Sequence, residues 1–368
     1  MWLQKLSILN FKNYTTAELG LLPTVNVFAG NNGAGKTNLL DAIHYLSICK
    51  SYFNPIDSQH IRWGEDFFMI QGIFEKNLEQ ETVSCGFKRA QKKQFKRNKK
   101  EYQRLADHIG LFPLVMISPN DVNSITHGSE NRRAFIDNAI SQTDSIYLNE
   151  LISYNRCLTN RNSLLRQLAT TGKYDATLLE ICDHQLVASG EKIVEKRKAF
   201  MERFVVLFYS HYQHLTEGTE EVQLVYDSLL LTHDFASLLT QHFDRDRLME
   251  RTTIGIHKDD LLLNIQGMPL KKFASQGQQK SFLIALKLAQ YTFLAQQKGF
   301  KPLLLLDDIF EKLDDKRIQR LMEIVSSQGF GQLCITDTNP SRMKKIFNDI
   351  QAEARIFDIE KGEVKNVT

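Results

Sequence analysis

The segment Gly30–Thr37 constrains the fold of this chain more than any other stretch. It reads Gly-Asn-Asn-Gly-Ala-Gly-Lys-Thr and matches the phosphate-loop pattern G-x-x-x-x-G-K-[ST] at every fixed position. A short run of β-branched and apolar residues, Val25–Ala29, precedes the loop, and residues 38–46 follow it with apolar side chains at helical spacing. A strand, a glycine-rich loop and a helix in this order predict a phosphate site at the start of the helix.

The loop supplies the groups that a polyphosphate needs. Three glycines let the backbone curl so that successive N–H groups point inward at the start of the helix. Lys36 brings a positive charge to the β- and γ-phosphates, and Thr37 offers a hydroxyl to Mg²⁺. A glycine-rich turn that binds nothing is the alternative, and the flanking strand and helix argue against it. The candidate ATP-binding residues are Gly30, Asn31, Asn32, Gly33, Ala34, Gly35, Lys36 and Thr37.

Two acidic residues end an apolar run near the C-terminus. Asp307 and Asp308 follow four leucines, the pattern of a buried parallel strand that delivers polar side chains to the carboxyl edge of a sheet. We expect Asp307 to hold Mg²⁺ together with Thr37, and Asp308 to orient the attacking water. Lys36 and the two acids are therefore the candidate catalytic residues, and a plain buried strand with exposed ends is the alternative. The sequence has no Asn-Lys-x-Asp guanine-reading pattern, which favours ATP over GTP.

A third motif, Ser275-Gln276-Gly277-Gln278, precedes a predicted helix over residues 281–297. The serine hydroxyl, the glycine backbone and the helix N-terminus together predict a second anion site, with Ser275, Gly277 and Gln278 as its candidates. One chain has little use for two γ-phosphate sites. We therefore expect Ser275 of one subunit to close over the nucleotide of another, in a symmetric dimer with two ATPs in its interface. An ordinary helix N-cap is the alternative.

Positive charge is concentrated in one segment of the chain. The 368 residues carry a formal net charge of +3, yet residues 88–104 hold nine basic side chains against a single acid, Glu101. This segment is predicted to form a hairpin whose tip contacts the phosphate groups of DNA, with Phe95 and Tyr102 assisting, or else a solvated tip. The candidate DNA-binding residues are Lys92, Lys93, Lys96, Arg97, Lys99 and Lys100.

Cysteine usage and hydropathy predict a cytoplasmic protein. The five cysteines are odd in number and scattered, without a C-x-x-C pair, which favours reduced thiols over zinc binding. No apolar run reaches the roughly eighteen residues of a membrane span. The first residues, Met1–Lys5, contain neither a signal-peptide core nor a small-residue cleavage site, so no membrane contact is expected.

The periodicity of the remaining chain alternates between strand and helix. Between the first two predicted strands the sequence indicates only a turn around Gly20 and Pro23. Strands are predicted over 3–11, 25–29, 67–74, 81–88, 114–118, 222–231 and 253–265, and helices over 148–169 and 175–214. The two helices are predicted to form an antiparallel arm, the first about 30 Å long, or to pack as an ordinary helical subdomain.

The phosphate loop, the serine motif and the acidic strand follow one another in this order along the chain. Together they resemble the motifs of ATP-binding cassette (ABC) ATPases of the SMC type. Within that group the chain is similar, nearly end to end, to the RecF family of bacterial recombination mediators. The phosphate loop alone is not specific to this family, but the whole set of matching segments is. These segments are Asn10–Tyr14, Asn38–Ile43, Arg132–Asp137, Arg161–Leu165, His257–Asp260 and Ser275–Lys280.

The resemblance implies a DNA-binding ATPase of recombinational repair. It implies an ATP-dependent homodimer on gapped DNA, or on double-stranded DNA with a single-strand junction, with RecR and RecO as partners. Indirectly it implies RecA, the recombinase that the protein helps to load. Hydrolysis would be weak, stimulated by DNA, and would release the dimer.

Three segments depart from the family pattern. Asn120 stands where many relatives carry a glutamine or an acid that senses the γ-phosphate. Glu130 or Asn131 replaces a proline before the paired arginines. After the Asp-Asp strand, Glu311 and Lys312 stand where a small residue and an acid are usual, which concerns contacts in the dimer interface.

The predicted fold class is α/β, an ABC-type P-loop ATPase lobe with mixed and antiparallel sheets plus a mainly helical lobe with a short antiparallel arm. Lobe I is expected to comprise residues 1–118 and 300–368. Lobe II comprises residues 119–299, with the arm at about 148–215 and the serine motif. The alternatives are the nucleotide-binding subunit of a membrane transporter, which lacks such a helical insertion, and another SMC-like chromosome-maintenance ATPase. A small-molecule kinase would leave the serine motif and the arm without a purpose.

Overall fold

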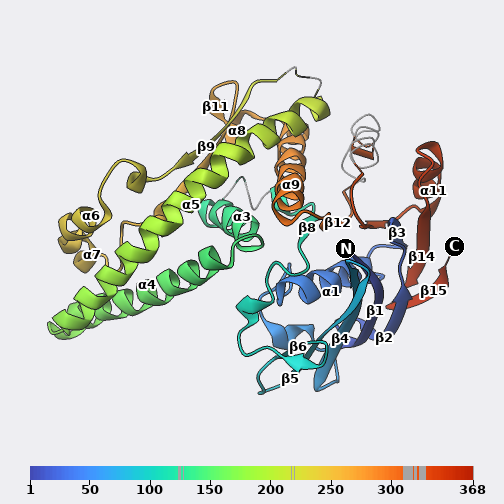
Figure 1. Cartoon of the computed structure of the whole chain (residues 1–368), viewed down its shortest axis with the longest axis horizontal. Helices are drawn as coiled ribbons and strands as arrows, with labels where there is room; N and C mark the ends of the chain where they lie inside the picture. Colours follow the sequence, from blue (N-terminus) through green and yellow to red (C-terminus); the bar gives the residue numbers. More distant parts are fainter. Residues whose placement is uncertain are drawn as a thin grey trace. The chain divides into compact units, whose positions relative to one another are not determined.

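The computed structural model describes residues 1–122, 126, 128–216, 218, 220–309, 318, 321–322 and 329–367. The chain folds as two compact units, one of Met1–Asp121 with Ser281–Thr368 and the other of Val122–Lys280 (Figure 1). The boundary at which the chain returns to the first unit, between Lys280 and Ser281, lies inside helix α9 (Gln276–Lys298). The sequence predicted this boundary after residue 299. The reason is that Lys287 and Tyr291 of this helix contact Asp121 and Gly331 of the first unit.

The first unit contains a six-stranded antiparallel sheet in the order β2-β1-β4-β5-β6-β7. Its strands are β1 (Trp2–Phe11), β2 (Tyr14–Gly20), β4 (Phe67–Lys76), β5 (Glu79–Lys88), β6 (Gln94–Arg97) and β7 (Lys100–Glu101). Strand β2 corrects the prediction of a mere turn between the first two strands. It is an edge strand that pairs with β1 alone and keeps polar side chains on its outer face, so its apolar signal is weak.

A second six-stranded sheet runs in the order β15-β14-β3-β13-β12-β8, and only β15 is antiparallel to its neighbour. Its strands are β3 (Val25–Ala29), β8 (Leu114–Ile117), β12 (Leu303–Leu306), β13 (Leu333–Asp337), β14 (Ala354–Glu360) and β15 (Glu363–Val367). The buried apolar run before Asp307 was predicted as a parallel strand and is confirmed as β12, which pairs in parallel with β13 through Leu306 and Ile335. Helix α11 (Pro340–Asp349) connects β13 to β14.

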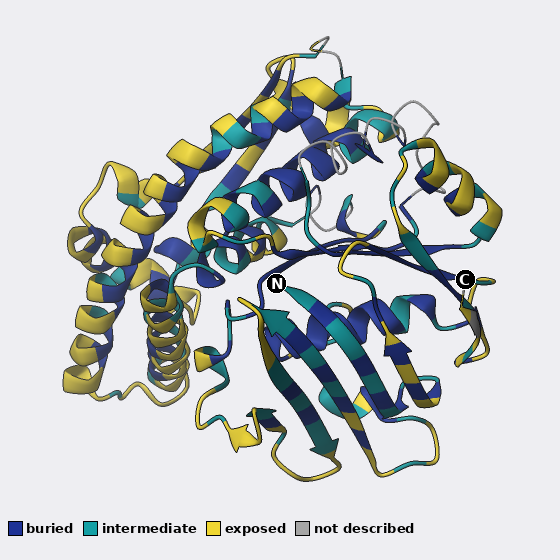
Figure 2. Cartoon of the chain, turned by 45° about the vertical axis from the view of Figure 1, so that its right-hand side comes forward, coloured by how far each residue is buried: buried dark blue, intermediate teal, exposed yellow. Residues whose placement is uncertain are grey.

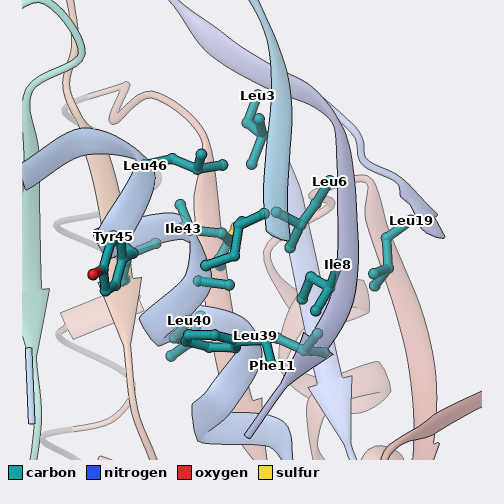
Figure 3. Packing of buried hydrophobic residues seen from close by; sticks show 14 of the residues in the cluster. Leu3, Leu6, Ile8, Phe11, Leu19, Leu39, Leu40, Ile43, Tyr45 and Leu46 are labelled. Atoms are coloured by element: carbon teal, nitrogen blue, oxygen red, sulfur yellow. The ribbon is translucent and has the colours of Figure 1, made fainter. Parts of the chain in front are cut away.

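Helix α1 (Lys36–Ile48) follows the phosphate loop and is buried on nearly all sides. Figure 3 shows Leu40, Ile43 and Leu46 of this helix against Leu6 and Ile8 of β1. The same core includes buried side chains of both six-stranded sheets. Burial all round is the behaviour of a core helix rather than an amphipathic surface helix, so the residues that follow the loop are held rigidly. Short 3₁₀ helices η1 (Asp57–His60) and η2 (Leu105–Asp107) complete the unit.

The second unit is mainly helical with a small antiparallel sheet. Its helices are α3 (Ser129–Ser141), α4 (Ser145–Thr171), α5 (Ala176–Thr216), α6 (Phe235–Gln241), α7 (Phe243–Leu248) and α8 (Leu270–Phe273). Its strands are β9 (Val222–Asp227), β10 (Asp260–Ile265) and β11 (Met268–Pro269), with 3₁₀ helices η3 (Leu229–Leu231) and η4 (Ile256–Lys258). The strand predicted over 253–265 therefore begins only at Asp260. Before it, Arg197 binds the carbonyl of Ile256 at 3.1 Å and the carboxylate of Asp259 at 2.9 Å, so a side chain rather than a strand partner holds this backbone.

Helices α4 and α5 form the predicted antiparallel arm (Figure 1). Glu150, near the start of α4, binds Lys192 far along α5 at 2.6 Å, whereas Arg161, later in α4, binds Asp183, earlier in α5, at 2.5 Å. Figure 2 shows mostly exposed residues where the two helices approach their connecting turn. None of the helices in the described part of the chain is both long and apolar enough to span a membrane.

Candidate nucleotide-binding site

The lysine of the phosphate loop lies within the loop itself. Lys36 is only 3% exposed, and its Nζ donates hydrogen bonds to the carbonyl oxygens of Gly30 at 2.8 Å and Asn31 at 3.2 Å. These neutral partners hold a buried ammonium group at the centre of the loop. Phosphate oxygens would form stronger, charge-assisted hydrogen bonds with the same group. The predicted phosphate contact therefore matches the placement of Lys36.

The connection between β1 and β2 supports the loop from outside. Asn13 Nδ2 donates to the carbonyl of Ala34 at 3.1 Å, its Oδ1 accepts from Asn38 Nδ2 at 2.7 Å, and the Tyr14 hydroxyl donates to the carbonyl of Gly35 at 3.1 Å. Gly35 has a φ of +114°, and a Cβ there would lie 2.4 Å from Asn13 Nδ2, so only glycine fits. Asn13 and Tyr14 belong to a segment that is similar to the RecF family, but the sequence alone predicts no role for them at the site.

The acidic strand meets the loop directly. The Thr37 hydroxyl donates to Asp307 Oδ1 at 2.8 Å, so the two predicted magnesium ligands are neighbours although 270 positions separate them in sequence. Burial raises the pKa of Asp307 above its usual value, hydrogen bonds from Thr37 and Thr336 oppose this shift, and the charge of Asp308 adds to it. A carboxylate whose ionised form is disfavoured gains from a nearby cation. The donor set of one hydroxyl and one carboxylate fits Mg²⁺, which prefers few protein oxygens.

Thr336 is a site residue that the sequence analysis did not assign. It lies in β13, next to the end of β12, and its hydroxyl donates to Asp307 Oδ1 at 2.8 Å. The Thr336 hydroxyl oxygen also accepts a hydrogen bond from the backbone N–H of Asp308 at 2.8 Å. Asp308 has a left-handed φ of +42°, a conformation that aspartate tolerates better than most residues. One threonine thus orients both acids, and its only sequence signal was the polar end of an apolar strand.

In the segment around Asn120, where many relatives carry a residue that senses the γ-phosphate, the buried acid is the next residue, Asp121. Asn120 is exposed, whereas Asp121 is buried. Asp121 accepts hydrogen bonds from the Tyr52 hydroxyl at 2.6 Å and from the backbone N–H of Ser118 at 2.9 Å. Of the family departures, Glu311 and Lys312 lie outside the described residues.

The serine motif opens helix α9, which begins at Gln276 rather than at the predicted Ser281. Ser275 Oγ accepts the backbone N–H of Gln278 at 3.2 Å, and Gln278 Oε1 accepts the backbone N–H of Ser275 at 2.7 Å. This reciprocal pair is a capping box, and it starts the helix five residues early. Gly277 lies in the first turn of the same helix. Ser275 is therefore an N-cap in this unit, and a hydroxyl that accepts one bond can still donate its own proton.

The basic segment forms the predicted hairpin. Asn98 and Lys99 connect β6 to β7 with φ values of +50° and +69°, the backbone of a two-residue turn that matches strand twist. Lys92, Lys99 and Lys100 are exposed, and Lys96 is half-buried. These four lysines present their charge to solvent.

Two other candidates in the same hairpin have partners within the protein. Lys93 Nζ lies 2.9 Å from Asp57 Oδ2 and donates to the carbonyl of Cys49 at 2.7 Å. Arg97 is paired with Glu81. The structure therefore divides the six predicted DNA contacts into four lysines at the surface and two cations that are each paired with an acid of the protein.

Phe95 is buried and cannot assist contact with DNA as predicted. Its ring is only 1% exposed and packs in the core against His108, with 4.7 Å between ring centroids. Because β-strand side chains alternate between faces, Phe95 points inward where its neighbours Gln94 and Lys96 point outward. Tyr102 packs over the same histidine and forms a hydrogen bond of 3.1 Å with His108 Nδ1. Burial lowers the pKa of His108 to about 4, so this histidine adds no positive charge to the hairpin at neutral pH.

Known proteins resemble this chain over nearly its whole length. The family model described as the RecF/RecN/SMC N terminal domain matches residues 2–364. The DNA replication and repair protein RecF of Flavobacterium johnsoniae is 49% identical over 359 residues, which cover 98% of this chain and 100% of the relative. The RecF of Phocaeicola vulgatus is 48% identical, with 99% of this chain and 98% of the relative covered.

Solved structures agree with these relatives. One of the recombination mediator protein RecF with ATP, from the RecFOR pathway, matches with a TM-score of 0.88 and 29% identity over 99% of this chain and 97% of that chain. The Smc head domain of Pyrococcus furiosus, solved with a domain of ScpA, matches with a TM-score of 0.58 at 16% identity over 100% of this chain and 96% of that chain. The second likeness shows a shared fold.

Proposed function

Because the chain belongs to the RecF/RecN/SMC N-terminal domain family, and within it to the RecF proteins of DNA replication and repair, we propose that it is an ATP-dependent DNA-binding protein of recombinational repair. It dimerises on ATP at gapped DNA or at junctions of single- and double-stranded DNA, and it helps to load RecA. The observation that carries this proposal is the 2.8 Å hydrogen bond from Thr37 to Asp307, which joins the phosphate loop to the acidic strand.

The residues divide the chemistry of ATP hydrolysis among them. The loop N–H groups and Lys36 would bind the β- and γ-phosphates, and Thr37 and Asp307 would hold Mg²⁺, which would supply positive charge to neutralise the phosphates. Asp308 accepts a hydrogen bond from the water that attacks the γ-phosphorus, and ADP and inorganic phosphate are the products. Thr336 keeps both acids in place, since its hydroxyl contacts the carboxylate of one and the backbone of the other. Turnover is slow, is stimulated by DNA, and acts as a switch.

Dimerisation and partners complete the proposal. Ser275, Gly277 and Gln278 of one subunit bind the γ-phosphate held by the other, so hydrolysis releases the dimer from DNA. RecR and RecO are the proposed protein partners, because a relative of similar structure is described within the RecFOR pathway. The RecF relatives span the whole chain at nearly half identity, which supports this function over a transporter subunit.

Lys36→Ala tests the proposal. Removing the buried ammonium should lower the ATP-dependent affinity for gapped DNA about tenfold or more, since a charge-assisted contact to phosphate is lost. Binding is measured by fluorescence anisotropy of a labelled gapped duplex with ATP and Mg²⁺. Asp308→Asn is the matched variant: it should still bind ATP and gapped DNA, while its hydrolysis rate falls. Wild-type protein that binds gapped DNA equally with and without ATP would refute the proposed function.

A further inference from the structure

One aromatic side chain in the first unit is almost completely exposed. Trp63 is 95% accessible to solvent, the largest value among the large hydrophobic residues in the described part of the chain. A single exposed apolar residue is ordinary in a soluble protein. Trp63 differs because it lies in a backbone turn that is tied to the neighbouring strand by hydrogen bonds.

A tight turn presents the indole. Arg62-Trp63-Gly64-Glu65 closes through a hydrogen bond from the N–H of Glu65 to the carbonyl of Arg62 at 3.0 Å. Gly64 has a φ of +85°, as the third position of a type II turn requires, which places Trp63 at the second position.

Strand β1 anchors both ends of this turn. The N–H of Arg62 donates to the carbonyl of Asn10 at 2.9 Å, and Asn10 Nδ2 donates to Glu65 Oε2 at 3.2 Å. The N–H of Lys12 donates to the carbonyl of His60 at 2.7 Å, which ties the preceding residues to the same strand. The backbone that carries Trp63 is thus fixed before any ligand arrives, and such preorganisation lowers the entropic cost of binding.

The surroundings of the turn combine apolar and basic groups on one face of the antiparallel sheet. Phe67 and Met69, directly after the turn in β4, are each 40% exposed. Phe67 pairs with the exposed Lys88 across β4 and β5, and paired residues share a face. Ser84, on the same face two pairs further along, pairs with Lys96 of the basic hairpin. Phe95 lies on the opposite, buried face.

The charge beside the turn is also mainly basic. The N–H of Arg89 donates to the carbonyl of Asp66 at 3.1 Å, which brings this exposed arginine next to the turn. The nearby acids are Glu65, whose carboxylate is bound by Asn10, and the exposed Asp66. The three basic residues Arg62, Lys88 and Arg89 outnumber these two acids, so the charge beside the turn is positive.

We propose that Trp63 stacks on an unpaired base of single-stranded DNA while Lys88, Arg89 and Lys96 contact its phosphates. This inference rests on the proposed function and names the form of DNA that this face takes. Stacking needs a base whose flat face is accessible, and in a duplex both faces are covered by neighbouring base pairs. Aromatic residues, methionine and arginine are enriched in protein interfaces as well, but lysine is depleted there, so Lys88 and Lys96 favour nucleic acid over a protein partner. Trp63 and the basic residues around it therefore bind the single-stranded part of a gap.

Tryptophan fluorescence tests the stacking. The chain has two tryptophans, Trp2 and Trp63, so Trp2→Phe leaves the indole of interest as the only one. A thymidine oligonucleotide, added with ATP and Mg²⁺, should quench this fluorescence to saturation. A strand of equal length with abasic sites keeps the phosphates but offers no base, and it should not quench. Quenching of equal depth by both strands would overturn the proposal.

Affinity gives the second measurement. Trp63→Ala should weaken binding of the thymidine strand about tenfold, whereas binding of blunt duplex should change less than twofold. Leu78→Ala is the matched control, because Leu78 is 93% exposed in the turn between β4 and β5 and should leave both affinities unchanged.

Two outcomes separate this inference from the function on which it rests. If Trp63→Ala binds the thymidine strand as wild type does, while gapped DNA still binds with ATP, the stacking is wrong and the proposed function stands. If wild-type protein binds none of these DNAs with ATP, the proposed function fails first. Quenching by a protein partner but not by DNA would make this face a protein interface and overturn the inference.

Discussion

Asp307 is a buried carboxylate whose ionised form the fold disfavours. Burial raises its pKa, whereas hydrogen bonds from Thr37 and Thr336 offset only part of the cost. Asp337, one strand away, is also buried, but Arg342 Nη2 donates to its carboxylate at 2.6 Å. These two acids at the ends of adjacent strands therefore differ. Asp337 has a cationic partner within the protein, whereas Asp307 is placed to receive a cation together with the nucleotide.

Asp307→Asn should remove ATP hydrolysis without lowering the stability of the nucleotide-free protein. Because the raised pKa disfavours the charged form, ionised Asp307 destabilises the fold above that pKa, and this effect disappears as the pH falls through it. The free energy of unfolding at pH 7 should thus equal or exceed that of wild type, and the difference should vanish on acidification. Urea denaturation across pH measures it.

Asp337→Asn provides the contrast. It breaks the hydrogen-bonded ion pair with Arg342 and should lower the free energy of unfolding by about 2 kcal/mol. If Asp307→Asn destabilises the protein as much as Asp337→Asn does, Asp307 holds the fold together and is not poised for a cation.

The basic side chains of the hairpin lie in two kinds of environment, at the surface and against the protein. Lys92, Lys96, Lys99 and Lys100 present their charge to solvent, whereas the Lys93 ammonium is held by Asp57 and by the carbonyl of Cys49. Lys93 also lies over the ring of Tyr45, 4.9 Å from its centroid. An element that looks uniformly basic in sequence thus has two physical roles.

Reversing the four solvent-facing lysines to glutamate should weaken DNA binding whatever the sequence. The slope of log affinity against log salt should flatten by up to about 0.9 for each lost phosphate contact, while ATP affinity stays constant. Anisotropy titrations over a range of salt concentrations measure the slope. An unaltered slope would show that this hairpin tip is merely solvated.

Lys93→Glu is the control within the same hairpin. It places a carboxylate against Asp57, so it should lower the melting temperature, which the reversal of the four surface lysines should leave nearly unchanged. Equal melting temperatures for the two variants would mean that the ion pair of Lys93 contributes nothing to stability.

The whole molecule is built by inserting one compact unit into another. The chain leaves the first unit at Asp121 and re-enters it at Ser281, so the phosphate loop and the acidic strand are distant in sequence yet lie in one unit. Lys287 Nζ lies 3.4 Å from Asp121 Oδ2 and donates to the Tyr52 hydroxyl at 3.1 Å. The exit and the re-entry are thus held together by a buried polar contact within the first unit.

Nucleotide-dependent dimerisation is the prediction at this scale. Ser275→Asp keeps an N-cap side chain, so stability should not change, but it sets a negative charge where a γ-phosphate is proposed to bind. Sedimentation with Mg²⁺ and a non-hydrolysable ATP analogue should show a wild-type dimer and a monomeric variant, and ADP should leave both mostly monomeric. Ser275→Arg should likewise stay monomeric while binding ATP.

Ser275→Ala separates the cap from the anion contact. Loss of the cap should cost about 1 kcal/mol of stability, an effect that the aspartate variant avoids. If Ser275→Asp dimerises normally, or if wild-type protein dimerises without regard to the γ-phosphate, Ser275 is a helix cap and nothing more.

Local patterns in the sequence determined the phosphate loop, the acidic strand, the arm and the hairpin turn. Each depends on a few adjacent residues, because glycine conformations, strand alternation and helical spacing are properties of the neighbouring backbone. Two local features, the edge strand β2 and the early start of α9, were nevertheless missed. The first carries weak alternation, and the second depends on a reciprocal cap.

Tertiary structure alone decided which side chains serve the site and which serve the fold. Thr336 and Asn13 acquired roles because strands and loops far apart in sequence lie side by side at the phosphate loop. Phe95 is buried in the core, whereas Trp63 is exposed at the surface. The physical reason is that a side chain's partners are set by strand pairing and burial, and both require the whole chain to be folded.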